Sequence, residues 1–534
     1  MAVLAPGREP DSSPDRRPRT SRARNGVGTD SSATPIEPTT WPGAATSSAR
    51  TGLAQRLLPV LPTDRRRALI VAAILGGIGL WTRLWRLSYP PDLIFDEAYY
   101  PVHADDMLEL GSEYNRGYDY IVHPPLGKWL IGLGEIVFGN TPPGWRVPSA
   151  IAGTICVLLL FWIARRMSGS TYLGGIAALL LAADAFSFVL GRTGLLDIFL
   201  PMFVLAGLAA LLIDRDQVRT RLATMLEDGP LPAFPRLGLR SWRMIAGMLL
   251  GAACAVKWSG IWFLAAFAIL SVLWDRAALR AAGARRPNRV AVRRVLPGAL
   301  GALAVLPVVT YVASFAGWFA TETAQGRHWA QQNPDTAFGF VPDSLRSLWH
   351  QHGQWLNFHS GLSTDHPWES NPWSWLVTGR PILFWNPQGI TDEAGGQIVR
   401  YVLLVGTPVL WFAFAPAVLW MLWLLVSRLD WRAGTVLAAI AAGWLSWFIN
   451  LERTMFLFYM APAVPFFILA VVLTLGSVLG RHEDSPLRRR LGLIAVSIYV
   501  ALVILNFIWL HPILVGSPLP EVEWRARMMF RSWF

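Results

Sequence analysis

Residues 65–100 read RRRALIVAAILGGIGLWTRLWRLSYPPDLIFDEAYY. Three arginines precede an apolar run that is long enough to cross a bilayer, and two adjacent carboxylates, Asp96 and Glu97, follow that run. Basic residues before a first span place the N-terminus in the cytoplasm. The stretch therefore predicts a membrane protein whose first extracytoplasmic loop contains a pair of acids.

The composition is that of an all-α polytopic membrane protein. The chain has 534 residues, of which 53% are hydrophobic and 15% are charged, whereas soluble domains carry about 25% charged residues. Apolar runs of roughly 17–25 residues recur along most of its length, as spanning helices require. The net charge of +12 is assigned to cytoplasmic loops, so no nucleic-acid partner is expected. Cys156 and Cys254 lie inside apolar runs and predict neither a disulfide framework nor a metal cluster.

Length and hydropathy predict about eleven spans. They lie near residues 68–86, 146–164, 171–188, 194–213, 243–256, 259–274, 295–319, 399–427, 432–449, 455–479 and 491–511. The apolar stretch 129–138 carries Glu135 and is too short to cross the bilayer, so we expect an interfacial helix there.

These spans divide the chain into five parts. Residues 1–64 are rich in Pro, Ser, Thr, Arg and Gly and are expected to be a disordered cytoplasmic tail. The other parts are a first transmembrane half (65–320, with an extracytoplasmic loop at 87–145), an extracytoplasmic Trp/His-rich loop (321–398), a second group of spans (399–512) and an extracytoplasmic C-terminal tail (513–534).

The distribution of arginine supports this orientation. The predicted inner loops include Arg165, Arg166, Arg215, Arg219, Arg240, Arg276, Arg280, Arg285, Arg286, Arg293, Arg294, Arg488, Arg489 and Arg490. The loop 321–398 has only Arg327, Arg346 and Arg380. The asymmetry predicts an odd number of spans with the C-terminus outside, and the inner arginines are interpreted as orientation signals alone.

The remaining charged residues of interest fall at or near the predicted outer ends of spans. They are Asp96, Glu97, His123, Lys128, Arg192, Asp197, Lys257, Glu452 and Arg453. Lys128 and Lys257 are the only lysines in the chain. The sequence therefore predicts that any chemistry takes place on the extracytoplasmic face of the plasma membrane.

Asp96 and Glu97 are the candidate catalytic residues. A carboxylate at this position suits a general base that deprotonates a weak nucleophile such as a hydroxyl. A solvated loop that happens to contain two acids remains the alternative. Tyr99 and Tyr100 follow at the start of an expected interfacial helix, and we interpret them as part of an aromatic belt.

Residues 123–128 read His-Pro-Pro-Leu-Gly-Lys and predict a stiff turn. Two prolines restrict the backbone, and glycine lets the chain turn before Lys128. Such a turn could use His123 and Lys128 to position a polar substrate. The alternative is an ordinary turn before a helix, with a lysine that extends to the membrane surface.

Three separated cations, Arg192, Lys257 and Arg453, are predicted on the same face and suggest a common anionic ligand. A lipid phosphate fits their charge, depth and compartment. Arg192 could instead pair with Asp197, five residues further on, and both interpretations stay open. Asp197 and Glu452 are candidates for positioning the substrate.

The loop 321–398 combines tryptophan with histidine. Its residues of these types include Trp329, Trp349, Trp355, Trp368, Trp373, Trp375, Trp385, His350, His352, His359 and His366. The histidine spacing matches no tight metal-ligand motif and the loop has no cysteine, so no metal and no other cofactor is expected.

The motifs resemble those of the protein O-mannosyltransferases, in particular their actinobacterial branch. The matching stretches are Phe-Asp-Glu (95–97), His-Pro-Pro-Leu-Gly-Lys (123–128), Arg-Thr-Gly-Leu-Leu-Asp (192–197), Lys-Trp-Ser-Gly (257–260) and Glu-Arg-Thr-Met-Phe-Leu-Phe-Tyr (452–459), in that order. The resemblance covers roughly 68–512. It implies a GT-C fold, a polyprenyl-phosphate mannose donor and acceptor hydroxyls on Ser or Thr of exported proteins, met near the secretion translocon.

The resemblance also implies roles for individual residues. Asp96 would activate the acceptor, while Arg192, Lys257 and Arg453 would contact the donor phosphate. Family members are regarded as needing no catalytic metal. Eukaryotic members carry a β-trefoil insertion in the long loop, whereas the loop 321–398 has no trefoil repeat, as in the bacterial branch.

The leading hypothesis is therefore an inverting mannosyl transfer at the outer face of the plasma membrane. One rival is another lipid-linked glycosyltransferase of the same fold that acts on cell-wall glycan or lipid. A second rival is a transporter, which would be expected to place charges at mid-bilayer and often to show duplicated halves. The sequence shows no such repeat, and the charges cluster at one face.

The predicted orientation can be tested in intact cells. A cysteine introduced at Ser344, in the loop 321–398, is expected to react with a membrane-impermeant thiol reagent because that loop is placed outside. A cysteine at Ser13, in the tail placed inside, should stay unlabelled until the cells are permeabilised. Labelling in the opposite pattern would put the candidate site in the cytoplasm, out of reach of an exported acceptor.

Overall fold

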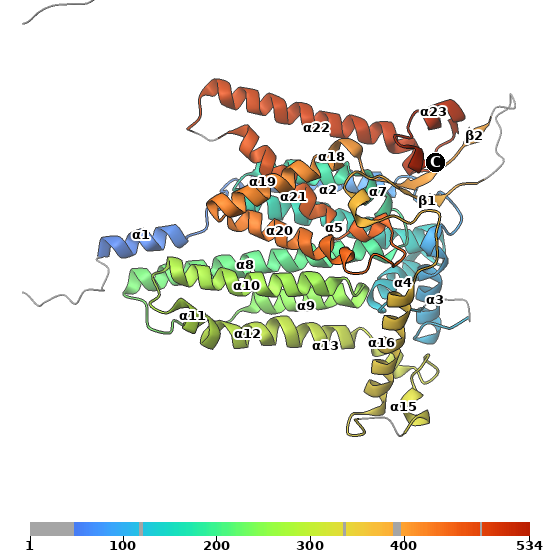
Figure 1. The fold of residues 1–534 in the computed structure, drawn as a ribbon, viewed down its shortest axis with the longest axis horizontal. Helices are drawn as coiled ribbons and strands as arrows, with labels where there is room; N and C mark the ends of the chain where they lie inside the picture. The colour runs from blue at the N-terminus through green and yellow to red at the C-terminus, as the bar shows by residue number, and fades with distance from the viewer. Residues whose placement is uncertain (1–46, 117–120, 335–337, 388–396, 481–482) are drawn as a thin grey trace, which may run out of the picture. The chain divides into compact units, whose positions relative to one another are not determined.

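A computed structural model describes residues 47–116, 121–334, 338–387, 397–480 and 483–534 (Figure 1). The expected disordered tail, 1–64, lies within this range only from residue 47. There the expectation is wrong, because Ser47–Leu57 forms helix α1. Buried Ala54 and Leu57 of α1 pack in a small apolar cluster with α8 and α10, which explains why this part of the tail is ordered.

Long apolar helices dominate the described chain, and seven of them are long and apolar enough to cross a membrane. They are α2 (Arg65–Leu84), α5 (Pro142–Ser168), α8 (Phe199–Asp228, preceded by the turn η2, Leu196–Ile198), α10 (Gly260–Ala281), the continuous run α11–α13 (Pro287–Ala313), α18–α19 (Pro408–Arg428) and α22 (Pro486–Leu514). Each coincides with a predicted span. The helices of the run 287–313 are α11 (Pro287–Val290), α12 (Leu296–Leu300) and α13 (Leu306–Ala313), joined by π-helical turns.

The other four predicted spans coincide with shorter helices. These are α6 (Thr171–Ala182), α9 (Ser241–Val256), α20 (Trp431–Gly443) and α21 (Val464–Leu479). Short turns such as α7 (Ala185–Leu190), η5 (Leu445–Phe448) and η6 (Leu457–Met460) account for the rest of their predicted length. The multi-pass character is thus confirmed, while the count of eleven stays a prediction for these four.

Shorter elements gather at one end of the long helices (Figure 1). They include η1 (Phe95–Ala98), α3 (Tyr100–Leu110), α4 (Leu126–Phe138), α14 (Ala316–Ala320), α15 (Trp329–Gln332), α16 (Asp343–Gly361), α17 (Pro372–Trp375), α23 (Glu521–Arg525) and η7 (Arg531–Trp533). Helix α4 contains the stretch 129–138 for which a short helix was expected. Helix α3 begins at Tyr100, as expected from the spacing that follows Asp96.

Two small antiparallel ribbons join distant parts of the chain at this end. Strand β1 (Ile382–Trp385) pairs with β3 (Val402–Leu404), and β2 (Ile398–Val399) pairs with β4 (Leu519–Pro520). The predicted span 399–427 is therefore wrong at its start. Residues 402–404 form a buried strand, and the helix begins only at Pro408, where proline is favoured in a first turn.

The C-terminal tail packs back onto the structure. The indole Nε1 of Trp533 donates to the carbonyl oxygen of Thr378 at 2.9 Å, and the hydroxyl of Ser532 donates to the carbonyl of Gly379. The side chain of Trp533 is completely buried. Residues 513–534 are therefore part of the folded region at this end of the helices.

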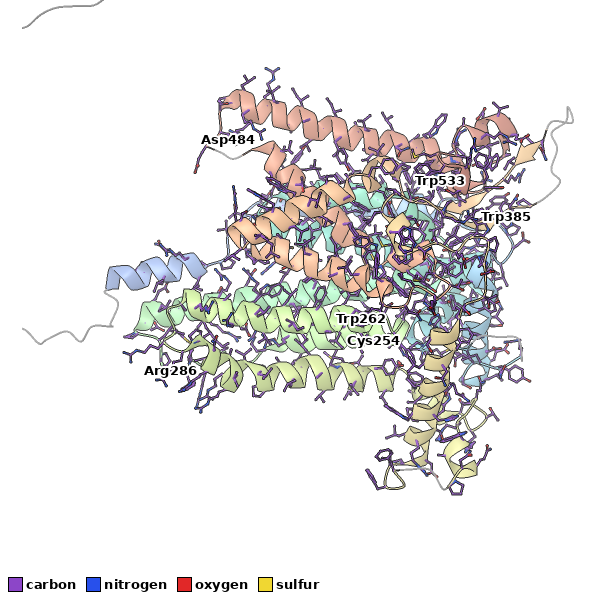
Figure 2. All side chains as sticks on the ribbon, in the orientation of Figure 1. Cys254, Trp262, Arg286, Trp385, Asp484 and Trp533 are labelled. Carbon is purple, nitrogen blue, oxygen red and sulfur yellow. The ribbon has the colours of Figure 1, made fainter. Side chains whose placement is uncertain are left out.

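The arginine-bearing loops and the aromatic loop lie at opposite ends of the helices. Figure 2 shows Arg286 and Asp484 at one end and Trp385 and Trp533 toward the other. The arginine-rich end contains more than orientation signals, which corrects that expectation. Arg240 bonds the carboxylates of Asp214 in α8 and Asp275 in α10. Buried pairs of this kind tie neighbouring helices together, because either partner alone would be an uncompensated charge.

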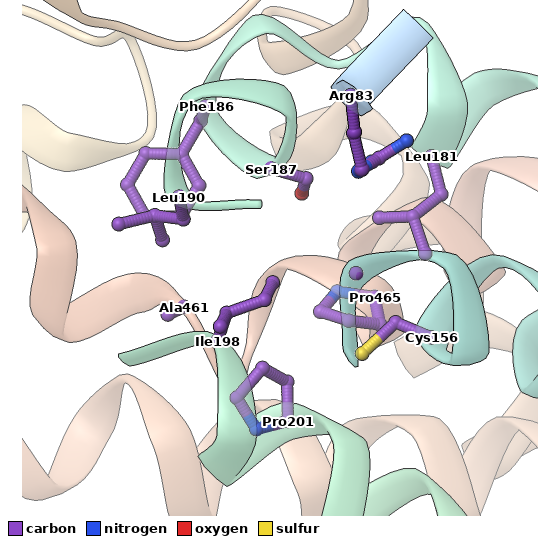
Figure 3. A pocket seen from close by; sticks show the side chains of 11 residues that line it. Arg83, Cys156, Leu181, Phe186, Ser187, Leu190, Ile198, Pro201, Ala461 and Pro465 are labelled. Carbon is purple, nitrogen blue, oxygen red and sulfur yellow. The ribbon is translucent and has the colours of Figure 1, made fainter. Parts of the chain in front are cut away.

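Helix α2 ends on a buried arginine beside a small cavity (Figure 3). Arg83 is fully buried and its Nη1 donates to the carbonyl of Gly79 at 3.0 Å. The cavity next to it, lined also by Cys156 and Ser187, has a volume of about 10 Å³, near the size needed for one water. A Cβ at Gly191 would lie only 2.6 Å from Arg83 Nε, so glycine is required there. This packing holds residues 191–197 against α2.

Candidate active site

Asp96 is held in place by the strained residue before it. Phe95 has a φ of +51°, a left-handed conformation that is uncommon for a non-glycine residue. Its ring stacks on Phe384 of β1 at a centroid distance of 4.7 Å and meets Phe458 edge-on at 5.9 Å. Aromatic packing from two distant segments therefore compensates the strain and fixes the direction in which Asp96 leaves the backbone.

Glu97 points away from Asp96 into a completely buried ion pair. Its carboxylate accepts from Arg146 Nη2 at 2.6 Å and from Arg146 Nε at 2.8 Å. It also accepts from the backbone N–H of Gly194 at 2.7 Å and of Ile94 at 3.1 Å. Four donors saturate the carboxylate, so Glu97 is suited to positioning, whereas Asp96 is left for chemistry.

Arg146 in α5 completes this arrangement with bonds to the loop that precedes Asp96. It donates to the carbonyl oxygens of Leu87 at 3.2 Å, Pro90 at 2.6 Å and Asp92 at 3.0 Å. One guanidinium thus satisfies both the Glu97 carboxylate and three backbone acceptors. The first loop consequently has a defined position on α5.

The Asp96 carboxyl lies in a partly buried polar cluster. The hydroxyl of Tyr100 donates to Asp96 Oδ2 at 3.3 Å. Burial raises the pKa of Asp96 to about 6, while the nearby Lys257 ammonium acts in the opposite direction. A carboxyl with such a pKa can accept and return a proton near neutral pH.

Lys257 is paired with Asp197, not free. Its Nζ lies 2.8 Å from Asp197 Oδ2, and both side chains are buried. The ammonium also lies 5.2 Å from the centroid of the Phe458 ring and 6.0 Å from that of Tyr100. The pair sits against the same tyrosine that contacts Asp96, so the structure brings Asp96, Asp197 and Lys257 together.

The suggested ion pair between Arg192 and Asp197 is therefore wrong. Arg192 instead caps the end of α2. Its guanidinium donates to the carbonyl oxygens of Thr82 at 3.1 Å, Arg83 at 2.7 Å, Trp85 at 2.7 Å and Arg86 at 3.3 Å. Carbonyls at a helix C-terminus attract a cation, and here four of them occupy this one. The geometry gives no support to a phosphate contact by Arg192.

His123, His359 and Arg453 form a second group in the same cluster. The rings of His123 and His359 stack at 5.2 Å. His359 Nε2 donates to the carbonyl of Val122 at 2.9 Å, so its Nδ1 is free to accept from Arg453 Nη2 at 3.4 Å. Burial and the surrounding cations hold the pKa of His123 well below its usual range, which keeps that ring neutral.

Arg453 is the cation with the most donor capacity left. Its guanidinium lies over the ring of Tyr459 at 5.2 Å and over that of Trp447 at 5.8 Å. Its Nε is buried without a hydrogen-bonding partner among the described residues, and no salt bridge in that part of the chain involves it. An aromatic cradle around such a cation suits an incoming anion.

Lys128 and Glu452 lie outside this cluster. Lys128 Nζ pairs with Glu113 Oε1 at 2.9 Å and donates to the carbonyl of His123 at 3.2 Å. The lysine is buried and closes the 123–128 turn, so the alternative of an exposed lysine at the membrane surface is wrong. Glu452 is exposed to solvent.

Several cluster residues were missed from the sequence. Tyr100 was interpreted as part of an aromatic belt, yet it is buried and bonded to Asp96. His359 and Tyr459 were named only as members of the long loop and of the 452–459 motif, with no role in the site. The signals were present in the histidines of the long loop and in the Phe-Tyr that ends the Glu452 motif. Only the fold shows which of them reach Asp96.

Trp258, next to Lys257, is also fixed at the edge of the cluster. Its Nε1 donates to the Tyr311 oxygen at 2.9 Å, and the Tyr311 hydroxyl donates to His352 Nε2 at 2.6 Å. His352 Nδ1 in turn donates to the carbonyl of Leu348 at 2.7 Å. In the described part of the chain, no group of three or more His, Cys, Asp or Glu side chains is arranged to hold a metal.

Known proteins are similar in sequence to this chain over most of its length. Two family models match the chain. The family described as "C-terminal four TMM region of protein-O-mannosyltransferase" matches residues 344–533, and the family described as "Dolichyl-phosphate-mannose-protein mannosyltransferase" matches residues 122–224. The polyprenol-phosphate-mannose–protein mannosyltransferase of Mycolicibacterium smegmatis is 43% identical over 88% of this chain and 94% of its own length. The relatives of the same name in Mycobacterium tuberculosis (41%; 93% and 96% covered) and Corynebacterium glutamicum (38%; 86% and 92% covered) are also similar.

The fold resembles a solved structure as well. The chain aligns with the S. cerevisiae protein O-mannosyltransferase Pmt1-Pmt2 complex bound to the sugar donor, with a TM-score of 0.69 and 15% identity. The alignment covers 88% of this chain and 93% of that one. At this identity the likeness concerns the fold alone.

The helical architecture is that of the GT-C fold of membrane-embedded glycosyltransferases. Within that class, the chain belongs to the polyprenol-phosphate-mannose–protein mannosyltransferase family. Both the expected fold class and the family resemblance are thereby confirmed.

The different roles of the two acids can be measured as stability. Glu97→Gln is expected to lower the melting temperature of the purified protein, because it leaves the buried Arg146 without its countercharge. Breaking a buried ion pair costs about 3–5 kcal/mol. Thermal unfolding in detergent, followed by intrinsic fluorescence, measures the change. Glu452→Gln, at an exposed acid, is the matched control, and equal melting temperatures for the two variants would remove the structural role of Glu97.

Proposed function

We propose that the protein transfers mannose from polyprenyl-phosphate mannose to Ser or Thr hydroxyls of exported proteins. The observation that carries this proposal is the position of Asp96, whose pKa is raised to about 6 by burial, in one cluster with Lys257 and Arg453. A base and two cations are what a hydroxyl acceptor and a phosphate leaving group require. The names of the relatives supply the sugar and the protein acceptor.

Asp96 takes the proton from the acceptor hydroxyl in the proposed reaction. The hydroxyl oxygen forms a bond to the anomeric carbon of mannose while the bond from that carbon to the phosphate oxygen breaks. The electron pair of the broken bond stays on polyprenyl phosphate, and attack from the opposite side inverts the anomeric configuration. The donor already carries its leaving group, so neither ATP nor a nucleotide sugar is needed at the site.

Arg453 and Lys257 stabilise the charge that grows on the phosphate. Arg453 provides free donors, whereas the positive charge of Lys257 is partly balanced by the carboxylate of Asp197 at 2.8 Å. Arg192 does not bind the phosphate in this proposal, because its guanidinium already donates to four backbone carbonyls. His123 and His359 remain neutral polar groups that position the substrate, and Lys128 acts only through the turn it closes.

The reaction takes place on the extracytoplasmic side of the plasma membrane in this proposal, with the N-terminus in the cytoplasm. Phe384 of β1 stacks on Phe95, next to Asp96, and Trp385 of the same strand lies toward the end of the helices opposite to Arg286 (Figure 2), which supports this orientation. Exported acceptors would be met there as they leave the secretion translocon. The rival that mannosylates cell-wall glycan or lipid is separated by a deletion strain, which should lose mannose from secreted glycoproteins while its wall glycans stay normal.

Transfer of labelled mannose from polyprenyl-phosphate mannose to a Thr-rich peptide, in membranes or reconstituted vesicles, tests the function directly. Asp96→Asn is expected to lower the rate by about 10²–10⁴-fold, because an amide cannot accept the proton. Its melting temperature should match that of the unaltered protein. Near-normal turnover by a folded Asp96→Asn variant would show that another group is the base.

The pKa of Asp96 also predicts a pH dependence. The base must be ionised, so kcat/KM is expected to rise with pH through about 6 and to level off at higher pH. The steady-state rate at low acceptor concentration, measured across this interval, gives the profile. A rise centred near the usual pKa of an exposed aspartate, about 3.9, would show that Asp96 is not buried in the working enzyme.

A further inference from the structure

Helix α16 carries an exposed apolar stripe that the proposed catalytic cluster does not use. Leu345, Trp349 and Leu356 are 41%, 83% and 58% exposed. Phe338 and Phe340, just before the helix, are 68% and 86% exposed. Large side chains exposed to this extent over one short region of a chain mark an interaction surface.

The stripe lies along one side of the helix. At 3.6 residues per turn, Leu345, Trp349 and Leu356 project within about 40° of one another. Pro342 and Gly353 flank them on the same side, and none of the five residues is charged. Exposed Ser360 also projects from this side, so the exposed surface there is uncharged and mainly apolar.

A second side of α16 packs against the outer ends of the spanning helices. Leu348 and Trp355 are buried there, and Trp355 stacks on Phe315 at 6.1 Å. His352 accepts the hydroxyl of Tyr311, in α13, at 2.6 Å. By helical spacing His352 lies between this buried side and the stripe. The side of α16 that turns toward α13 is therefore the one next to the stripe.

The remaining side of α16 is polar and carries α15. His350 stacks on Trp329 at 3.7 Å, and the Ser347 hydroxyl accepts from the backbone N–H of Ala330 at 3.0 Å. Gln354 and Asn357 are exposed on this polar side. An exposed apolar side and an exposed polar side are typical of a helix that lies at a membrane surface.

The surface of α13 shows what lies next to the stripe. Val308 and Val309 in α13, and Val305 just before it, are each more than half exposed, as expected for side chains that face lipid. Figure 1 shows α16 running across the direction of α12 and α13, with its N-terminal end and α15 beyond them. The stripe therefore continues the lipid-facing surface of α13 beyond the edge of the helices.

We propose that α16 is a membrane-surface helix, with Leu345, Trp349 and Leu356 buried in the outer leaflet and α15 held on the water side. The partner is the lipid surface itself. Tryptophan and phenylalanine are suited to this interfacial depth. This proposal is based on which side chains of α16 are exposed and does not depend on the proposed reaction.

The docked helix sets the depth of the catalytic cluster in the membrane. His359, near the C-terminal end of α16, stacks on His123 and accepts from Arg453. A helix that rests on the leaflet at its N-terminal end therefore holds these groups at a defined height above the acyl chains. That height is where a lipid-linked phosphate presents its charge.

Site-directed quenching tests the assignment in the full-length protein. A background with Cys156→Ala and Cys254→Ala receives Trp349→Cys or Leu345→Cys, and the thiol is labelled with an environment-sensitive fluorophore. The labelled proteins are placed in phosphatidylcholine nanodiscs, some of whose lipids carry a nitroxide on the acyl chain. Gln354→Cys and Asn357→Cys, on the polar side of the same helix, are the matched controls.

Nitroxide lipid is expected to quench the probes at 345 and 349 several-fold more strongly than the probes at 354 and 357, while aqueous iodide shows the reverse order. Iodide quenching at 349 as strong as at 354 would overturn the proposal. Protection of 345 and 349 from both quenchers would also overturn it and would identify a protein, such as a second copy of the chain, as the occupant. An unchanged melting temperature of each labelled variant establishes that it is folded.

Discussion

The buried ion pair between Glu97 and Arg146 is the contact on which the structure around Asp96 depends. Arg146 Nη2 lies 2.6 Å from Glu97 Oε2, and both side chains are buried. Glu97 also accepts from Gly194, and Arg146 also binds three carbonyls before Asp96, so three segments meet at one carboxylate. A buried charge without its partner is costly, which makes this junction rigid. Asp96 is adjacent to Glu97 in the chain, so this rigid junction also fixes the position of Asp96.

Burial then determines the chemistry that the neighbouring groups can perform. The same loss of solvent that raises the pKa of Asp96 to about 6 keeps His123 neutral. It also requires Lys257 to keep a countercharge, which Asp197 provides at 2.8 Å. The result is one proton acceptor, one balanced cation and one cation, Arg453, with donors still available. Charges in such an environment act more strongly than they would in water.

Segments far apart in the sequence close the region around this cluster. His359, from the loop after α13, bonds the carbonyl of Val122 in the first loop, and Phe95 stacks on Phe384 of β1. Trp533, at the end of the chain, bonds the carbonyl of Thr378. The loop 321–398 and the C-terminal tail are thus structural parts of the site's surroundings. They fix the aromatic walls against which Asp96 and Arg453 are placed.

The sequence by itself determined the class, the seven long apolar helices and the end of the molecule at which the candidate site residues gather. Hydropathy over about twenty residues reports on the membrane, because the bilayer has a fixed thickness and tolerates few charges. It also singled out Asp96, Lys257 and Arg453. Only the tertiary structure decided partners: Asp197 pairs with Lys257 and not with Arg192, and Tyr100 joins the cluster instead of a belt. Pairing depends on which side-chain donors and acceptors come within about 3 Å of each other. Neither the periodicity nor the composition of the sequence predicts that distance.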